Sequence, residues 1–239
     1  MDEPRPRIRP LAAWRAVRAL LRNPDDTKRV FNVIDALSGR SGERLFERFR
    51  ATPSGARILA ERRDLLASLR DRERLLALPP GSLGRSYAEF MGREKISAEG
   101  LVEASQEGGR APDPALSPER RLVGARMRDQ HDLWHVVTGY GRDLVGEAAV
   151  LAFTYAQTRN RGIGLIVAVA YWRGGSAAPW LRPFLREAFR RGRRAAWLPA
   201  ADWEALLPRP LEEVRAELGL GEPPSYEALR SAGAPALAA

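Results

Sequence analysis

The sequence predicts an all-α fold, a single compact domain of several helices. Apolar residues recur at three- and four-residue spacing along most of the chain, the pattern of helices with one buried face. The strict alternation typical of half-buried strands is scarce. Of the 239 residues 44% are hydrophobic, enough to bury a core and to exclude wholesale disorder. We expect the domain to span residues 10–224, between a flexible N-terminus of residues 1–9 and a C-terminal tail of residues 225–239.

The N-terminal half contains several predicted helices, beginning with one at residues 10–21. The apolar face of this first helix is predicted to consist of Leu11, Trp14, Val17 and Leu21. Short helices are expected around residues 30–37 and 45–49. A charged helix is then predicted from 56 to 78, and a Pro- and Gly-containing turn follows at 78–84.

The C-terminal half is predicted to be helical too, after a flexible connection at residues 107–117. Ser117 and Pro118 form a good helix start, and the helix should run to about Thr138. A second helix is expected at 143–157. The apolar run after Gly162 is predicted to be a buried helix, with a strand as the alternative because many of its residues are β-branched. Two further helices are predicted, at residues 179–191 and 203–218.

The composition limits which metal sites, redox centres and partners the protein can have. The chain has no cysteine, so disulfides, iron–sulfur clusters and cysteine nucleophiles are excluded, and any metal must be held by nitrogen and oxygen ligands. The net charge of +9 comes almost entirely from arginine, since Lys28 and Lys95 are the only lysines. This charge suits an anionic membrane or an acidic substrate, although a compositional habit of the genome would produce it too. Because no continuous basic tract is present, we expect no nucleic-acid partner.

No stretch of the sequence is long and apolar enough to cross a bilayer as one helix. The longest, residues 163–172, is about half of the roughly 20 residues that a membrane span needs. The first residues contain no apolar signal core, and Asp2 and Glu3 argue against a transit peptide. We therefore expect a cytoplasmic protein that associates peripherally with the inner face of the cell membrane.

The two histidines of the chain fall within one five-residue window, His131 to His135. Four-residue spacing on a helix places both imidazoles on one face, one turn apart, and Asp132 can reach the same side. Gly139 then ends the helix, so that Glu147, in the first turns of the returning helix, would face back across the hairpin. Two imidazoles and two carboxylates that converge in this way suit Zn²⁺, Fe²⁺ or Mn²⁺.

Other interpretations of these residues stay open on spacing alone. Histidines four residues apart also occur on solvated faces, and Asp132 could be a surface charge. Tyr140 could donate a phenolic hydrogen bond to a substrate or simply pack. Arg142 could contact a substrate or form a helix-capping pair with Asp143. The basic cluster at 190–194 could meet lipid phosphates or be a solvated helix end.

The spacing His-Asp-x-x-His followed by eleven residues and Glu, from His131 to Glu147, resembles the signature of the coenzyme Q (ubiquinone) biosynthesis protein 4 family. Further segments resemble the same family, at residues 78–87, 153–158, 192–195 and 210–219. The resemblance runs from about Pro10 to Pro224. One departure is residues 159–162, which read Arg-Asn-Arg-Gly where the family commonly has Gly-Leu-Pro. The shape of the following loop, and with it part of the substrate entrance, is therefore not implied.

The resemblance implies a helical fold with His131, Asp132, His135 and Glu147 as ligands of a metal ion, usually zinc, with iron or manganese as alternatives. It implies a metal-dependent lyase that removes the C1 carboxylate of 4-hydroxy-3-methoxy-5-polyprenylbenzoate, in some accounts with replacement by hydroxyl. It also implies peripheral membrane contact and other ubiquinone-biosynthesis proteins as partners, and we expect a homo-oligomer. The alternative is a non-catalytic scaffold that binds polyprenyl lipids, because four protein ligands would fill a tetrahedral structural zinc.

Overall fold

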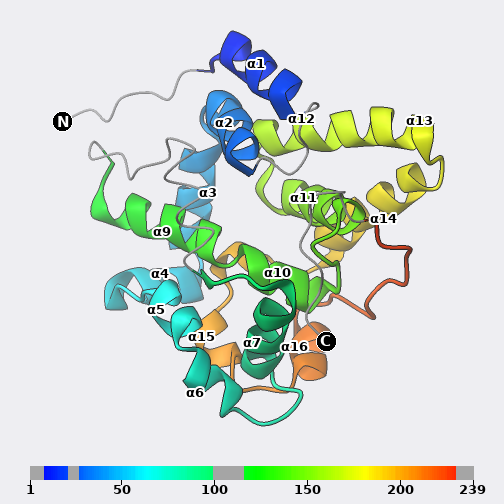
Figure 1. Ribbon diagram of the computed structural model, residues 1–239. Coiled ribbons are helices and arrows are strands. Elements are labelled where there is room, and N and C mark those ends of the chain that lie inside the picture. The colour runs from blue at the N-terminus through cyan, green and yellow to red at the C-terminus, as the bar shows by residue number, and fades with distance from the viewer. Residues whose placement is uncertain (1–7, 21–26, 99–115, 230–239) are drawn as a thin grey trace.

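The computed structural model describes residues 8–20, 27–98 and 116–229 (Figure 1). Every named element in these ranges is helical, and their only isolated bridge joins Ser82 and Pro210. The predicted all-α fold is therefore confirmed. The predicted flexible N-terminus, except Ile8 and Arg9, lies outside the described residues, as does most of the predicted connection at 107–117. None of the helices in the described ranges is long and apolar enough to span a membrane.

The helices of the first half are α1 (Pro10–Leu20), α2 (Thr27–Ser38), α3 (Ser41–Arg50), α4 (Pro53–Glu61), α5 (Leu65–Arg70), α6 (Arg72–Leu76) and α7 (Leu83–Glu94). The single charged helix predicted at residues 56–78 is wrong, because α4, α5 and α6 occupy this segment. Arg62 ends α4 in the left-handed conformation, with φ of 51°. Asp64 and Asp71 then accept hydrogen bonds from amides in the first turns of α5 and α6. The apolar periodicity continues through this segment and predicts one helix, but the two capping aspartates divide it into separate helices.

The elements of the second half are α9 (Pro118–Asp129), α10 (His131–Thr138), α11 (Leu144–Thr158), α12 (Arg161–Val169), the π-helix η1 (Ala170–Gly174), α13 (Gly175–Ala177), α14 (Leu181–Arg194), the 3₁₀-helix η2 (Leu198–Ala200), α15 (Trp203–Leu206) and α16 (Leu211–Glu217). The continuous helix predicted from Pro118 to Thr138 is wrong. Gln130, between α9 and α10, has ψ of −3°, and its buried side chain accepts a hydrogen bond from the Trp203 indole at 2.5 Å. This contact with a distant helix holds the interruption in place.

Two further predictions have clear outcomes. The helix predicted at residues 203–218 is divided between α15 and α16, where Pro208 and Pro210 lack the amide hydrogen that a helix interior needs. The apolar run after Gly162 forms α12, which η1 extends, so the helix prediction is confirmed and the strand alternative is wrong.

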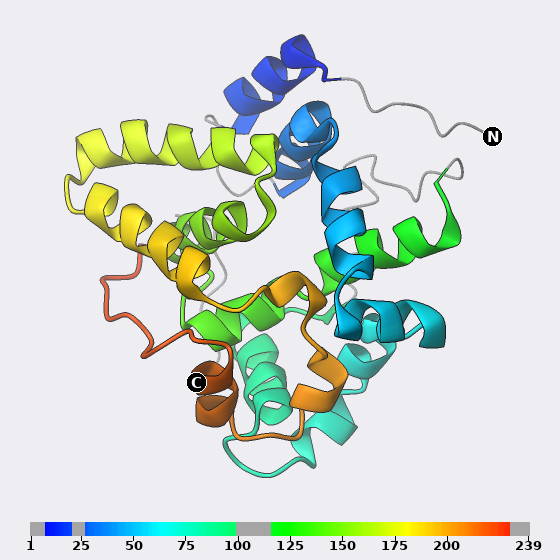
Figure 2. The ribbon, with the colours of Figure 1, turned by 180° about the vertical axis from the view of Figure 1, so that it is seen from behind.

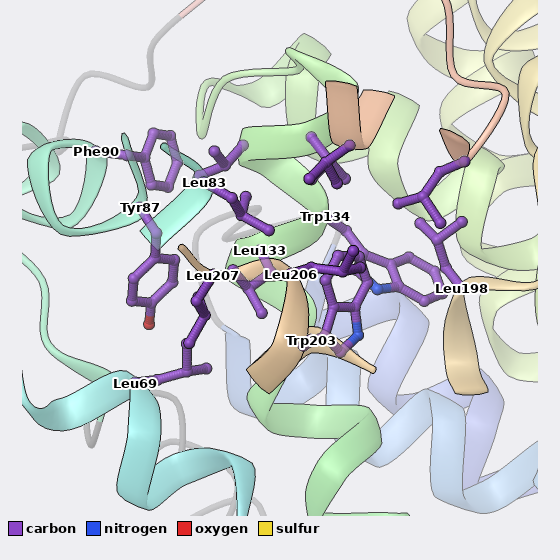
Figure 3. Close-up of a cluster of buried hydrophobic side chains, with 14 of the residues drawn as sticks. Leu69, Leu83, Tyr87, Phe90, Leu133, Trp134, Leu198, Trp203, Leu206 and Leu207 are labelled. Carbon is purple, nitrogen blue, oxygen red and sulfur yellow. The ribbon is translucent and has the colours of Figure 1, made fainter. Parts of the chain in front are cut away.

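Helix α10 lies in the middle of the molecule. Helices α11, α12 and α14 lie on one side of it, and α7, α15 and α16 on the other (Figures 1 and 2). All of its residues except His131 are buried. Leu133 and Trp134 point into the largest hydrophobic cluster, where Trp134 lies near Leu198 and Trp203 (Figure 3). Burying these apolar surfaces anchors α10 and fixes which of its faces remains for the site.

Helix α1 packs through only one described member of its predicted apolar face, Val17. Leu11 and Trp14 are 73% and 61% exposed. Among the residues of α1 whose side chains are described, Ala13, Ala16 and Val17 are buried. Small alanine side chains let α1 approach α2 closely, which leaves the large apolar side chains on the outside. The fourth member of the predicted face, Leu21, lies outside the described residues.

The chain beyond residue 224 stays bonded to the domain. The Tyr226 hydroxyl and the Leu229 amide both donate to the carboxylate of Asp143, at 2.7 and 3.2 Å. The C-terminal tail predicted to begin at residue 225 therefore begins inside the folded unit.

Candidate metal centre

The site is built on the hairpin that joins α10 to α11. Gly139 ends α10 in the left-handed conformation, with φ of +76°. Asp143 begins α11, because its Oδ1 atom accepts from the amides of Val145 and Gly146 at 3.0 and 3.2 Å. The hairpin thus returns Glu147, in the first turn of α11, to the side of α10.

The structure brings the ring nitrogens of His131 and His135 close to each other and to both predicted carboxylates. The Nε2 atoms of His131 and His135 are 3.2 Å apart, and Glu147 Oε2 lies 3.7 and 3.5 Å from them. A carboxylate oxygen of Asp132 lies within 4.8 Å of a ring nitrogen of each histidine. Zinc–nitrogen bonds of about 2.0–2.1 Å at tetrahedral angles would separate two donors by roughly 3.3 Å. The imidazoles and Glu147 therefore fit one shared ion, and Asp132 lies beside the same two imidazoles.

His135 is held in the tautomer that metal binding requires. Its Nδ1 atom lies 2.9 Å from the backbone carbonyl oxygen of Tyr140, an acceptor, so Nδ1 carries the hydrogen. Nε2 is then the ring atom that faces His131 and Glu147, and it can bind a metal ion when it carries no hydrogen. The ring of Phe90 stacks at 6.0 Å from the His135 ring and limits its movement. A second partner that fixes the ring in this way is typical of metal-binding histidines.

The charges of the cluster reinforce one another. Burial by itself would lower the pKa of His135, but the charge and hydrogen bond of Glu147, with the charge of Asp132, raise it above its ordinary value. Burial would raise the pKa of Glu147, but the charge of His135 and hydrogen bonds from both histidines hold it well below its ordinary range. Glu147 is thus ionised at neutral pH. Positive charge is favoured between these groups, and a divalent cation would supply it in place of a proton.

Two arginines that sequence reasoning missed hold the end of α10. Arg215 donates to the carbonyl oxygens of Val136 and Val137, both at 3.0 Å, and Arg191 donates to that of Thr138 at 3.2 Å. Both side chains are buried. They satisfy carbonyls that a helix end leaves without an intrahelical partner. Nothing in the arginine-rich sequence distinguishes them from exposed neighbours, and Arg191 belongs to the cluster predicted to meet lipid or solvent.

The two weaker candidates contribute differently. The phenol ring of Tyr140 is buried against Phe184 and lies under the Arg191 guanidinium, with centroid distances of 5.8 and 5.0 Å. Tyr140 therefore meets the site through its carbonyl oxygen, while its side chain packs. Arg142 places its Nε atom 3.4 Å from Glu147 Oε1, at the partly exposed edge of the site. The capping role predicted for Asp143 is confirmed, but Arg142 pairs with Glu147.

Comparison with known proteins matches most of the chain to one protein family. The sequence profile described as coenzyme Q (ubiquinone) biosynthesis protein Coq4 matches residues 9–224. The mitochondrial ubiquinone biosynthesis protein coq4 of Botryotinia fuckeliana is 32% identical over 75% of this chain and 62% of its own length. The corresponding protein of Arthroderma otae is 32% identical over 78% and 67%, and the homologue from Rattus norvegicus is 30% identical over 76% and 66%. The chain thus spans about two thirds of the length of these relatives.

The fold has a counterpart among solved structures. A crystal structure of a Nostoc punctiforme protein assigned to ubiquinone biosynthesis superposes with a TM-score of 0.65 at 21% identity, covering 90% of this chain and 98% of that one. This likeness concerns the fold, whereas the sequence profile and the relatives identify the family. The chain belongs to the Coq4 family of coenzyme Q (ubiquinone) biosynthesis proteins.

Proposed function

We propose that this protein is a metal-dependent decarboxylase that removes the C1 carboxylate of 4-hydroxy-3-methoxy-5-polyprenylbenzoate. The observation that carries the proposal is the convergence of His131, His135 and Glu147 donors at 3.2–3.7 Å on the hairpin between α10 and α11. Family membership supplies the pathway.

The ion would be held by His131, His135 and Glu147, with Asp132 close enough to join. Two imidazoles and carboxylates suit zinc, and they suit iron or manganese as well. When bound, such an ion supplies Lewis acidity that lowers the cost of negative charge on the substrate. The side chains of His131 and Glu147 are 26% and 32% exposed, so the site has an edge that a substrate can reach.

The residues at this edge would orient the substrate. Arg142, whose side chain is 29% exposed, places a guanidinium where it can attract the ring carboxylate. The bond between C1 and the carboxylate carbon breaks, carbon dioxide leaves, and the electron pair on C1 takes a proton from water at the exposed edge. Buried Phe90, stacked on the His135 ring, excludes water from that side of the imidazole.

The proposal includes peripheral contact with an anionic membrane, where a polyprenyl substrate resides. Trp172 and Trp180 are 65% and 44% exposed near the corner between α12 and α14 (Figure 1). Exposed arginines lie at this corner and along α14: Arg173 on η1, and Arg186, Arg190 and Arg193 on α14. Aromatic rings beside basic side chains suit the headgroup region of an anionic bilayer. Other ubiquinone-biosynthesis proteins and a second copy of this chain are further proposed partners.

A scaffold with a structural metal is the second candidate. The observation that favours it is the burial of Asp132 and His135, which are 5% and 1% exposed. If Asp132 moved inward, four protein ligands would close a tetrahedral zinc and leave no position for substrate. Polyprenyl lipids would then be bound and presented rather than converted.

Turnover of the prenylated hydroxybenzoate by purified protein, with bound metal quantified, tests the proposal. We expect one ion per chain, release of carbon dioxide, and loss of both in His135→Ala and Glu147→Ala. Glu89→Ala, an exposed glutamate paired with Arg85, serves as the control and should keep both. Release of carbon dioxide with a new ring hydroxyl would instead indicate the oxidative reaction. Full metal occupancy without any conversion would favour the scaffold.

A further inference from the structure

The chain after α16 crosses the metal hairpin as a strap, which we define as residues 220–229. It has no regular secondary structure, and most of its side chains are exposed. The first part of the strap is tied to α10 by Arg191, which donates to the carbonyl oxygens of Leu220 and Glu222 as well as Thr138. One buried guanidinium therefore joins the strap to the end of the metal helix.

The middle of the strap fills space beside the turn of the hairpin. Pro223 packs against Gly139 so closely that an added β-carbon there would lie 2.5 Å from Pro223 Cβ. At the far end, the Leu144 amide donates to the Leu229 carbonyl at 2.8 Å, and the Leu229 amide donates to Asp143. The strap thus contacts the hairpin at its start, its turn and the beginning of α11.

Tyr226 makes the central contact. Its half-buried ring lies 5.0 Å from the ring of Phe184 on α14. Its hydroxyl accepts from the Gly141 amide at 2.7 Å and donates to Asp143 Oδ2 at 2.7 Å. Burial and the bond to the Asp143 carboxylate raise the pKa of Tyr226, so the phenol keeps the proton that it donates.

The two groups that Tyr226 joins each support a predicted metal ligand. Gly141 directly follows Tyr140, whose carbonyl fixes the tautomer of His135. Asp143 caps α11 and so sets the position from which Glu147 reaches the site. One hydroxyl therefore connects the backbone behind an imidazole with the helix start behind a carboxylate.

We propose that Tyr226 is a positioning residue for the metal centre and that the strap is part of the centre's support. This inference rests on the proposed metal centre. It adds a residue beyond the part of the chain that the family profile matches, since that match ends at residue 224.

Tyr226→Phe tests the inference because it removes the hydroxyl and keeps the ring. The matched control is Tyr155→Phe. It also removes a half-buried phenol hydroxyl, but from α11 rather than from the strap. In the metal-free protein, ¹⁵N NMR of the two histidines should show a protected Nδ1 hydrogen on His135 that exchanges faster in Tyr226→Phe. In a Co²⁺ titration, the dissociation constant of Tyr226→Phe should rise on the order of tenfold, with an altered visible spectrum.

The outcomes separate the two proposals. Unchanged histidine exchange together with an unchanged Co²⁺ affinity and spectrum in Tyr226→Phe would overturn the positioning role, while the metal centre would stand. Failure of the wild-type protein to bind Co²⁺ would reject the metal centre, and faster exchange in the variant would still support the positioning of His135. Equal effects in Tyr155→Phe would show a general loosening of α11 and would overturn the inference.

Discussion

Arg191 and Arg215 bring guanidinium groups into the interior, where such groups are retained only if their donors find acceptors. Their acceptors are mainly backbone carbonyl oxygens at the end of α10 and in the strap. Carbonyls at a helix end need partners in any case, so each contact satisfies two groups at once.

Arg191→Met should therefore be strongly destabilising. It keeps much of the side-chain volume but leaves the carbonyls of Thr138, Leu220 and Glu222 without this donor, at an expected cost of about 3 kcal/mol. Urea unfolding measures the free energy directly. Arg193→Met, on the exposed side of the same helix, is the control and should change stability by less than about 0.5 kcal/mol. Similar losses in both variants would contradict the role assigned to Arg191.

At the residue level, the sequence predicted the groups that act through their side chains, but not those that act through their backbone. His131, Asp132, His135 and Glu147 were predicted to converge, and the ring nitrogens of both histidines do lie near each of the two carboxylates. Tyr140 was considered for its phenol, but the structure uses its carbonyl oxygen. Every residue has such a carbonyl, so no sequence pattern could have selected this one.

The α10–α11 hairpin is the element that assembles the site. Its turn depends on a left-handed glycine whose missing side chain also makes room for Pro223 of the strap. Local signals predicted where α10 ends, because glycine in that position ends helices irrespective of the surroundings. The beginning of α10 was missed, because the interruption at Gln130 depends on Trp203, far away in the sequence.

Two glycine substitutions test whether Gly139 is needed for its backbone conformation and for the space it leaves to Pro223. Gly139→Ala should cost about 2 kcal/mol, since a β-carbon is strained at positive φ and would collide with Pro223. Gly124→Ala lies on the exposed face of α9 with no atom within 4 Å of the new methyl group, and should gain about 0.5–1 kcal/mol. Thermal or urea unfolding of both variants checks the pair. A neutral Gly139→Ala would contradict the packing of the strap on the turn.

At the scale of the whole molecule, the site lies where separate parts of the chain meet. Helix α10 is contacted by α7, α9, α11 and α16, and the strap closes the hairpin from outside. An ion that binds only this folded arrangement should stabilise the entire domain, because none of these contacts persists in the unfolded chain.

Zinc added at about 100 times its dissociation constant should therefore stabilise the protein by about 2.7 kcal/mol. For a domain of this size, that corresponds to a rise in melting temperature of roughly 5–10 °C. Differential scanning calorimetry with and without zinc measures it. The shift should disappear in His135→Ala and after treatment with a chelator. A shift of equal size in His135→Ala would place the zinc elsewhere on the protein.

The sequence by itself determined the helical class, the end of α10 and the approach of two histidines and two carboxylates. These follow from helical periodicity, a glycine stop and four-residue spacing, all of which act within a few turns of chain. Only the tertiary structure decided which arginines are buried, where α9 and α10 separate, which face of α1 is covered, and that Tyr226 supports the hairpin. Each of these depends on contacts between residues far apart in the chain, whose burial and geometry no local pattern records.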